Sequence, residues 1–325
     1  MNWSEPAQAK PDAPTPAGGG LQLHRYRLRF EAKSPAKAPL PMAVVRGSWG
    51  AALRRMACST QAPDCESCAL APHCGFRAVF DPLPPIGHAL GALSSVPPPY
   101  VLSELVPEGR GGWLHLVLLG PAQERLGLAL LAMEQACKQG LGRERTPYRV
   151  VVAQHWTCAG WQPLRNDRPP APSVQLLPRP ADKTQAAPAM QALHIALHSP
   201  VRLQDQGRII RPEDFTPRRW LMALVRRIGL MADLYGQPLE LDYRGLAEMA
   251  AQVQMSQASL AWEDDARWSG RQQKTHPMGG VTGSFRMEGP LAAFQPLLGA
   301  GQWLHVGKHA AFGQGRYRIL ESTAQ

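Results

Sequence analysis

The C-terminal part of the sequence gathers residue types that bind phosphate. Between residues 305 and 316, glycines alternate with cationic and titratable side chains: His305, Gly307, Lys308, His309, Gly313, Gly315 and Arg316. Glycine lets the backbone approach a ligand closely, and exposed backbone N–H groups beside cations suit anionic oxygens. The spacing matches neither a P-loop nor a dinucleotide-binding fingerprint. The segment therefore predicts a phosphate-binding loop, and the alternative is a set of tight turns between strands.

A second group with chemical potential is a cluster of cysteines. Cys58, Cys65, Cys68 and Cys74 are separated by six, two and five residues. Four thiolates can enclose a tetrahedral Zn²⁺ ion, so the spacing predicts a structural zinc site in a Cys-rich insertion over residues 58–74. An Fe–S cluster or simple burial are the alternatives. Cys137 and Cys158 are expected to be ordinary cysteines.

The overall charge indicates a polyanionic partner. The chain has 35 Lys+Arg against 25 Asp+Glu, a formal charge of +10, and such an excess favours RNA, DNA or an anionic membrane. No stretch approaches the roughly 18 apolar residues of a spanning helix, so we expect no membrane partner. Residues 1–20 are rich in Pro, Ala and Gly without an apolar signal core. We interpret them as a disordered segment and expect a cytoplasmic protein with reduced cysteines.

The elements of the first half follow from hydrophobic periodicity. In residues 21–30, Tyr26, Leu28 and Phe30 alternate with Arg25, Arg27 and Arg29, which predicts a strand with one buried and one basic face. Periodicity further predicts helices over residues 44–58 and 122–138 and strands over 113–119 and 148–153. The order approximates β-α-β-β-α-β.

The second half repeats the first. Residues 28–35 match 193–200 up to a shared Ser-Pro, and Trp49 with its following Arg pair is echoed by Trp220. Each half also ends in a Gly-x-Gly-Arg loop before a strand, at residues 140–143 and 313–316. Thr216 and Pro217 open the main helix of the second half, which ends before Gly236. The fold class is therefore predicted as α+β with two tandem ferredoxin-like domains, over residues 21–160 and 191–325, joined by a Pro/Ala-rich linker over 161–190.

Arginines occur at corresponding places in both halves. Arg54 and Arg55 follow Trp49, and Arg226 and Arg227 follow Trp220. Together with the basic face of the first strand, these pairs predict a continuous phosphate-binding groove, although solvated helix surface is the commoner role of such pairs. The expected RNA-binding set comprises Arg25, Arg27, Arg29, Arg46, Arg54, Arg55, Arg226, Arg227, Arg271, Lys274, Gly307, Gly313, Gly315 and Arg316.

Several motifs together resemble a known family. They are the basic first strand, Arg46-Gly-x-Trp-Gly50 followed by Leu53-Arg-Arg, the cysteine cluster, Pro99-Tyr-Val-Leu102, and the tail GGVTGSF…PLL…LHVGKHAAFGQG. This combination resembles the CRISPR-associated RAMP endoribonucleases that cut repeat precursor RNA, the sixth Cas protein family. The resemblance covers nearly the whole chain from Leu21. It implies recognition of a repeat stem-loop and RNA cleavage that needs no metal ion or other cofactor, with repeat RNA and other Cas effector subunits as partners.

Such cleavage proceeds by attack of a ribose 2′-OH on the adjacent phosphorus, leaving a cyclic phosphate and a 5′-OH. It needs a base, an acid and cations, and histidine can exchange protons near neutral pH. His305, Lys308 and His309 are therefore the predicted catalytic residues, with His276 and then His24 as rivals. The family often has a catalytic His near the first helix, whereas residues 44–58 contain none. There are two alternatives. One is a RAMP subunit that binds RNA without cutting it, and the other is a DNA-binding protein with a structural Zn or Fe–S site.

Overall fold

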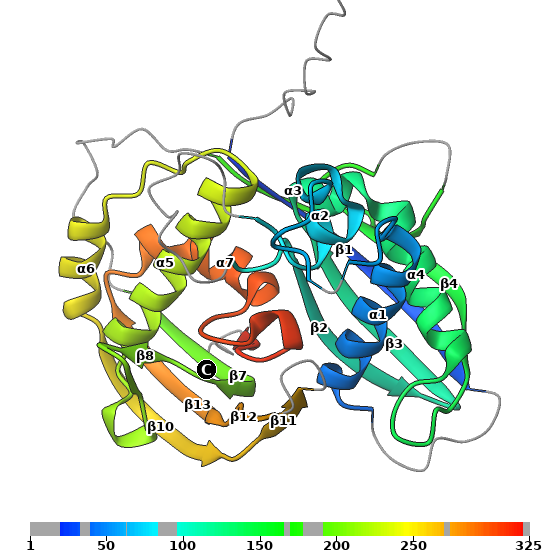
Figure 1. The fold of residues 1–325 in the computed structure, drawn as a ribbon. Helices are drawn as coiled ribbons and strands as arrows, with labels where there is room; N and C mark the ends of the chain where they lie inside the picture. Colours follow the sequence, from blue (N-terminus) through cyan, green and yellow to red (C-terminus); the bar gives the residue numbers. More distant parts are fainter. Residues whose placement is uncertain are drawn as a thin grey trace, which may run out of the picture.

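The computed structural model describes residues 20–32, 40–62, 64–83, 96–165, 170–177, 191–269 and 274–320. The predicted disordered segment up to residue 19, much of the predicted linker and Arg271 lie outside the described residues. The described chain forms two halves, each an antiparallel sheet with helices packed on it (Figure 1).

The first half contains the chain up to residue 176. Its strands are β1 (Leu21–Ala32), β2 (Tyr100–Glu108), β3 (Gly111–Leu118), β4 (Tyr148–Thr157), β5 (Gly160–Pro163) and β6 (Val174–Leu176). Its helices are α1 (Met42–Ala57), α2 (Gly75–Val79), α3 (Gly120–Glu124) and α4 (Leu126–Gln139), with a 3₁₀ turn at Ala71–His73. The predicted helix over residues 122–138 is thus two helices, because the backbone leaves the helical region at Arg125 (φ −102°, ψ 24°).

The second half is built on the same plan with additions. Its main strands are β7 (Gln191–Val201), β10 (Gln254–Glu263), β13 (Gly280–Gly289) and β14 (Tyr317–Leu320), and two short hairpins pair β8 (Gln204–Asp205) with β9 (Arg208–Ile209) and β11 (Ala266–Ser269) with β12 (Lys274–Pro277). Its helices are α5 (Pro217–Tyr235), α6 (Tyr243–Ala251) and α7 (Gln295–Leu304), with 3₁₀ turns at Pro212–Asp214, Ala292–Phe294 and Ala310–Phe312. Helix α5 begins as predicted, since the Thr216 side chain caps it by accepting from the Arg219 N–H.

Strand order confirms the predicted fold class. The first sheet runs β2-β3-β1-β4-β5 and the second β10-β13-β7-β14. In each half the first strand of the β-α-β-β-α-β unit therefore lies between its third and fourth strands, which is the ferredoxin-like order. The sequence repeat falls on equivalent elements, because β1 corresponds to β7 and α1 to α5.

Each half has its own apolar core around a buried tryptophan. Trp49 of α1 packs edge-on against Tyr100 and donates to the Ala129 carbonyl at 2.9 Å. Trp220 of α5 packs in the same way against Tyr317, with ring centroids 4.8 Å apart. In the first half, the sheet face that contacts Trp49 is covered by α1 and α4 (Figure 1). This arrangement leaves the basic face of β1 on the opposite side of the sheet.

The two halves share part of their apolar surface. Leu21, Leu23, Val101 and Val117 of the first sheet belong to the core of the second half. The main chain of Gly20 also accepts from the Gln237 N–H. The halves are therefore joined by a packed interface. None of the helices that the structure describes combines the length and apolarity that a membrane-spanning helix needs.

Candidate nucleic-acid interface

The glycine-rich loop between α7 and β14 lies between the two halves, against β2 and α1 (Figure 1). Gly313 has φ +86°, and a Cβ there would lie 3.0 Å from the Leu102 carbonyl oxygen of β2. At Gly315 a Cβ would lie 1.9 Å from the Val306 carbonyl oxygen, and at Gly307 2.6 Å from that of Arg202. These glycines are needed because protein backbone approaches them. The prediction that Gly307, Gly313 and Gly315 approach RNA phosphate is therefore not supported by their surroundings.

His305 follows α7 and has no exposed surface. Its Nδ1 lies 2.9 Å from the Gln314 carbonyl oxygen and its Nε2 3.0 Å from Ser103 Oγ of β2. The carbonyl can only accept, so Nδ1 carries the proton and Nε2 accepts from the hydroxyl. Burial, with the positive charge of Arg227 nearby, lowers the pKa of His305 to about 3. The geometry argues against the predicted catalytic role, because the imidazole is enclosed and both nitrogens are occupied. Nε2 holds the loop to β2 of the first half, and Nδ1 bonds within the loop itself.

Lys308 and His309 lie differently, at the surface end of the same loop. Lys308 is exposed and its N–H donates to the Arg202 carbonyl, which fixes the backbone. His309 is half-buried in the left-handed conformation, and its ring meets Phe312 edge-on at 6.1 Å. The Arg46 guanidinium of α1 covers Phe312 at 4.1 Å. The structure thus brings two predicted residues, Arg46 and His309, to one aromatic ring, and Lys308 precedes His309 in the chain.

Arg46 has a further property that suits an anion. Its Nε is buried and has no hydrogen-bond partner among the described residues. The rest of the guanidinium is enclosed by aromatic faces, since Phe80 lies 4.3 Å and Tyr100 5.8 Å from its Cζ atom. A cation held by rings rather than by a carboxylate keeps its charge available to a ligand.

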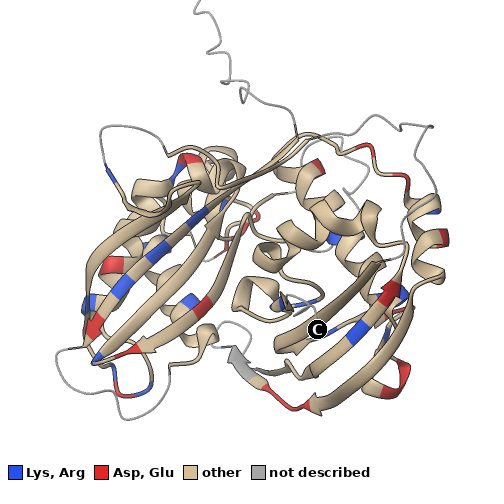
Figure 2. Ribbon diagram, turned by 180° about the vertical axis from the view of Figure 1, so that it is seen from behind, with Lys and Arg blue, Asp and Glu red and all other residues tan. Residues whose placement is uncertain are grey.

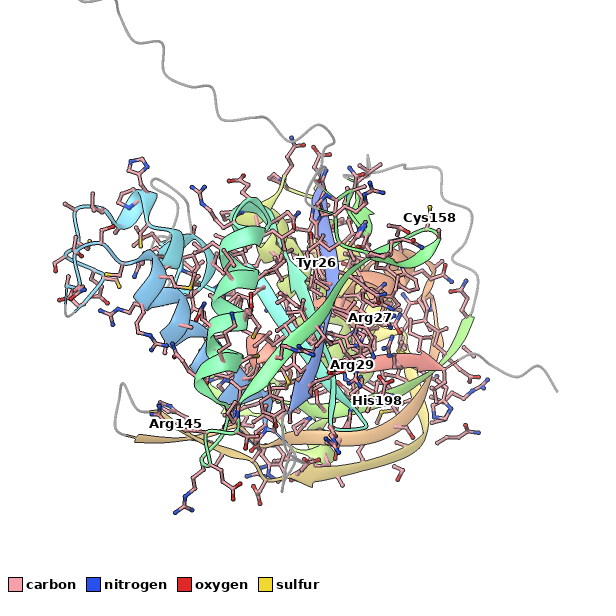
Figure 3. The ribbon with its side chains drawn as sticks, turned by 90° about the vertical axis from the view of Figure 1, so that its right-hand side faces the viewer. Tyr26, Arg27, Arg29, Arg145, Cys158 and His198 are labelled. Carbon is pink, nitrogen blue, oxygen red and sulfur yellow. The ribbon has the colours of Figure 1, made fainter. Side chains whose placement is uncertain are left out.

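The basic face of β1 is observed as predicted from its alternation. Arg25, Arg27 and Arg29 form a row on the sheet face away from α1 and α4, visible as the blue segments of one strand in Figure 2 and labelled in part in Figure 3. Arg27 Nε donates to Gln154 Oε1 of β4 at 2.6 Å. Arg29 lies 3.8 Å from the Glu108 carboxylate. Arg25 is only 7 % exposed, and burial with the nearby charge of Arg318 lowers its pKa to about 9.

Residues of the second half face this row. Glu104 of β2 forms ion pairs with Arg318 of β14 and with Arg316, which precedes that strand, so the predicted RNA-binding residue Arg316 is already partly neutralised. His115 of β3 lies close enough to Glu104 to interact with it electrostatically, and burial lowers the pKa of His115 to about 4. His198 at the end of β7 is exposed beside Arg316, and desolvation and that charge lower its pKa (Figure 3).

The structure does not bring the two Arg pairs into this interface. Arg54 donates to the Ala62 carbonyl and Arg55 to the Gln139 side chain, on the helix-covered side of the first sheet. Arg227 donates to the Leu304 carbonyl at 2.8 Å, and its burial lowers its pKa to about 10. Arg226 lines a separate hollow beside α6. The structure therefore gives no support to a continuous groove through these four residues, because the first sheet lies between the helix that carries Arg54 and Arg55 and the basic face of β1.

The remaining predicted residues contribute little to the interface. His24 is buried, which lowers its pKa to about 4. His276 lies on the β11–β12 hairpin. The side chains of Arg271 and Lys274 fall outside the description. Neither rival histidine stands among the residues around Phe312.

The four predicted zinc ligands line one cavity of about 150 Å³, bounded by α1, the following loop and α2. Thr60 Oγ1 lies 3.8 Å from Cys58 Sγ and 3.6 Å from Cys68 Sγ. This hydroxyl lowers the pKa of Cys58. In the part of the chain that the structure describes, no three His, Cys, Asp or Glu side chains converge closely enough to hold a metal ion. The segment therefore forms a cavity lined by cysteines, in which the thiols of Cys58 and Cys68 lie near the Thr60 hydroxyl.

Two family models match the chain. Residues 195–317 match the model described as CRISPR-associated endoribonuclease Cas6, and residues 21–172 match one described as an N-terminal domain. The first of these spans the second half from β7 into β14 and contains the glycine-rich loop. No curated protein sequence matches the chain.

Solved structures share the fold at low sequence identity. Cas6 from Thermus thermophilus superimposes with a TM-score of 0.53 at 16% identity, covering 93% of this chain and 100% of that one. A second Cas6, in a product complex, gives 0.52 at 18% identity, covering 92% and 99%. A chain of a Cas6-RT-Cas1–Cas2 complex gives 0.56 at 14% identity, covering 94% of this chain and 47% of that one. At these identities the likeness establishes a common two-half architecture.

Proposed function

The chain carries a domain of the CRISPR-associated endoribonuclease Cas6 family, and on this premise we propose that it cuts the repeat sequences of CRISPR precursor RNA. The observation that carries the proposal is the family match over residues 195–317. It confirms the resemblance to RAMP endoribonucleases that the sequence motifs indicated. The two ferredoxin-like halves and the row of arginines on β1 of the first half are consistent with an RNA partner.

The proposed reaction is a transesterification that needs no metal ion. The 2′-OH oxygen attacks the adjacent phosphorus while its proton passes to a base. The bond from phosphorus to the 5′ oxygen breaks, and that oxygen takes a proton from an acid. The products are a 2′,3′-cyclic phosphate and a 5′-OH. Cations beside the phosphorus stabilise the pentacoordinate transition state.

We assign these tasks to the residues around Phe312. His309 is the proton-transferring group, because its imidazole is half-buried at the surface end of the loop. Lys308 and Arg46 supply positive charge, because Lys308 is exposed and Arg46 is held by aromatic rings. His305 takes no part in the proton transfers. It holds the loop that carries Lys308 and His309 against β2.

A non-catalytic RAMP subunit that only binds CRISPR RNA is the second candidate. The observations in its favour are the burial of His305 and the absence of histidine from α1, which leave His309 without a second histidine around Phe312. Either activity is compatible with other Cas proteins as partners, as in the Cas6-RT-Cas1–Cas2 complex of similar fold.

For the cysteine segment we propose a structural Zn²⁺ ion that does not take part in cleavage. The support is that Cys58, Cys65, Cys68 and Cys74 line a single cavity. Zinc would take up thiolates, and the sulfurs of Cys58 and Cys68 would then turn from Thr60 toward the ion. An ion there would fix the loop between α1 and α2 and act on stability.

The proposed roles are tested by single-turnover cleavage of a labelled repeat RNA in EDTA, at saturating protein. Wild-type protein is expected to cut the RNA. His309→Ala should slow the chemical step by about a hundredfold to ten-thousandfold, the usual effect of losing a general acid or base. His73→Ala, an exposed histidine outside the loop, is the matched control. A wild-type rate in His309→Ala would refute the assignment, and tight binding without any cleavage by the wild type would favour the non-catalytic subunit.

A further inference from the structure

Four tryptophans surround the row of arginines on β1, and their positions follow from strand register. Trp113 of β3 lies opposite Arg29, and Trp156 of β4 pairs with Trp161 of β5. The fourth, Trp303, comes from α7 of the second half. The guanidinium of Arg27 lies 4.2 Å from the Trp113 ring centroid and 4.6 Å from that of Trp161. The result is a ladder of rings and guanidinium groups that crosses the sheet face away from α1 and α4.

The inner end of the ladder joins the two halves. Arg25 is nearly buried, with its guanidinium 3.1 Å from the Trp303 ring centroid and 4.6 Å from that of Trp156. Arg318 covers Trp303 at 4.9 Å. These contacts belong to the packing between the first sheet and α7, and the cation at their centre is buried.

The outer end, Trp113–Arg27–Trp161, is different because its arginine is half-buried, whereas Arg25 is buried. Arg27 hydrogen-bonds to the neutral side chain of Gln154, and no ion pair of Arg27 is found within the described ranges. The Glu108 carboxylate acts on Arg27 electrostatically, without an ion pair. Its neighbour Arg29 lies 6.0 Å from the Trp113 ring centroid and is paired with Glu108. The outer ladder therefore presents indole faces beside positive charge.

We propose that the Trp113–Arg27–Trp161 ladder binds unpaired nucleotides that flank the repeat stem, an inference that rests on the proposed function. Unpaired bases stack on aromatic rings while cations contact the backbone phosphates. Within a stem the base faces are covered by their neighbours, so a stacking surface selects single-stranded RNA. The ladder thus forms a binding site for the single-stranded flank, separate from the residues that bind the stem. Stacking on it does not select a particular base.

The test compares three labelled RNAs by fluorescence anisotropy with the whole protein. They are the repeat stem-loop alone, the stem-loop with an unpaired flank, and the same flank with abasic riboses, which keep the phosphates but cannot stack. Wild-type protein should bind the flanked RNA roughly 5- to 150-fold more tightly than the abasic one, the range expected for one stacked base.

Three variants show whether the gain comes from the ladder. Trp161→Leu should reduce the ratio toward one, and Trp161→Phe, which keeps an aromatic face, should retain most of it. Trp262→Leu is the matched control, because Trp262 is also half-buried and lies 3.7 Å from a guanidinium, that of Arg211 in the second half. It should leave the ratio unchanged.

The outcomes separate this inference from the proposed function. Tight binding of the stem-loop with no loss on the abasic flank would overturn the ladder alone. A ratio that Trp161→Leu leaves unchanged in folded protein would do the same. Failure to bind any of the RNAs would overturn the proposed function and the ladder with it.

Discussion

Replacing His305 with alanine is expected to reduce stability and to spare the chemical step. The imidazole makes two buried hydrogen bonds, one to Ser103 of the first half and one to Gln314 within its own loop. In His305→Ala the Ser103 hydroxyl loses its acceptor and the Gln314 carbonyl its donor, and both residues are at most 5 % exposed. Each unsatisfied buried group costs about 1–3 kcal/mol. The free energy of unfolding should therefore fall by roughly 2–6 kcal/mol, a large part of the stability of an ordinary protein.

The pH dependence gives a second signature of the same buried imidazole. Its pKa is about 3 in the folded protein, against about 6.5 when unfolded. Above pH 6.5 both states are neutral and pH has no effect. As pH falls from 6.5 toward 3, only the unfolded state takes up the proton, so stability is lost over this window. At pH 5 the loss is roughly 2 kcal/mol by linkage, and His305→Ala should lack this component.

Urea unfolding at pH 7 and pH 5, followed by circular dichroism, measures both effects. A double-mutant cycle with Ser103→Ala should show a coupling of about 0.5–3 kcal/mol. Single-turnover cleavage under conditions where His305→Ala is folded should stay near the wild-type rate. The reasoning is refuted if the variant keeps wild-type stability while its cleavage rate falls a hundredfold, because His305 would then act on the RNA.

Two further changes test the loop and the cysteine cavity. Gly313→Ala should destabilise the protein by about 1–3 kcal/mol, since φ is +86° and the new Cβ would lie 3.0 Å from the Leu102 carbonyl oxygen. Gly299→Ala in α7, where nothing lies within 4 Å of the new Cβ, should instead stabilise the protein by about 1 kcal/mol. Equal shifts of the melting temperature in the two variants would contradict the packing role of the loop. Protein purified without added metal should contain about one Zn²⁺ per chain by elemental analysis. The double variant Cys65→Ser, Cys68→Ser should lose the ion and melt at a lower temperature, whereas Cys158→Ser, at an exposed cysteine, should change neither the zinc content nor the melting temperature. Iron in the wild type would favour an Fe–S cluster, and protein without metal would refute the proposed site.

The sequence predicted the fold well because its strongest signals are local. Alternation in residues 21–30 determined which face of β1 is basic, and the repeat of Trp49 and Trp220 marked equivalent helices. The single helix predicted over residues 122–138 is in fact α3 and α4. Helix α7 was not predicted, because its small and apolar residues were interpreted as part of the glycine-rich segment.

The site was predicted less well because burial depends on the partner surface. A glycine-rich loop with His and Lys has the same composition whether it meets phosphate or β2, and only tertiary packing places His305 against Ser103. The Arg pairs of α1 and α5 repeat in the sequence because the halves repeat, which says nothing about a shared groove. The tryptophans of the ladder did leave a signal: Trp113 and His115 alternate with Leu114 and Leu116, which places them on the polar face of β3.

The central claim is cleavage of repeat RNA by its own 2′-OH, and a single 2′-deoxy substitution at the scissile nucleotide tests it most directly. The assay is single-turnover cleavage in EDTA of two repeat RNAs that differ only in that oxygen, with the product ends analysed. The account predicts that the all-ribose RNA is cut to a 2′,3′-cyclic phosphate and a 5′-OH, and that the deoxy RNA is bound equally well but not cut. Cleavage of the deoxy RNA at the same position, or cleavage only after a divalent metal ion is restored, would contradict it.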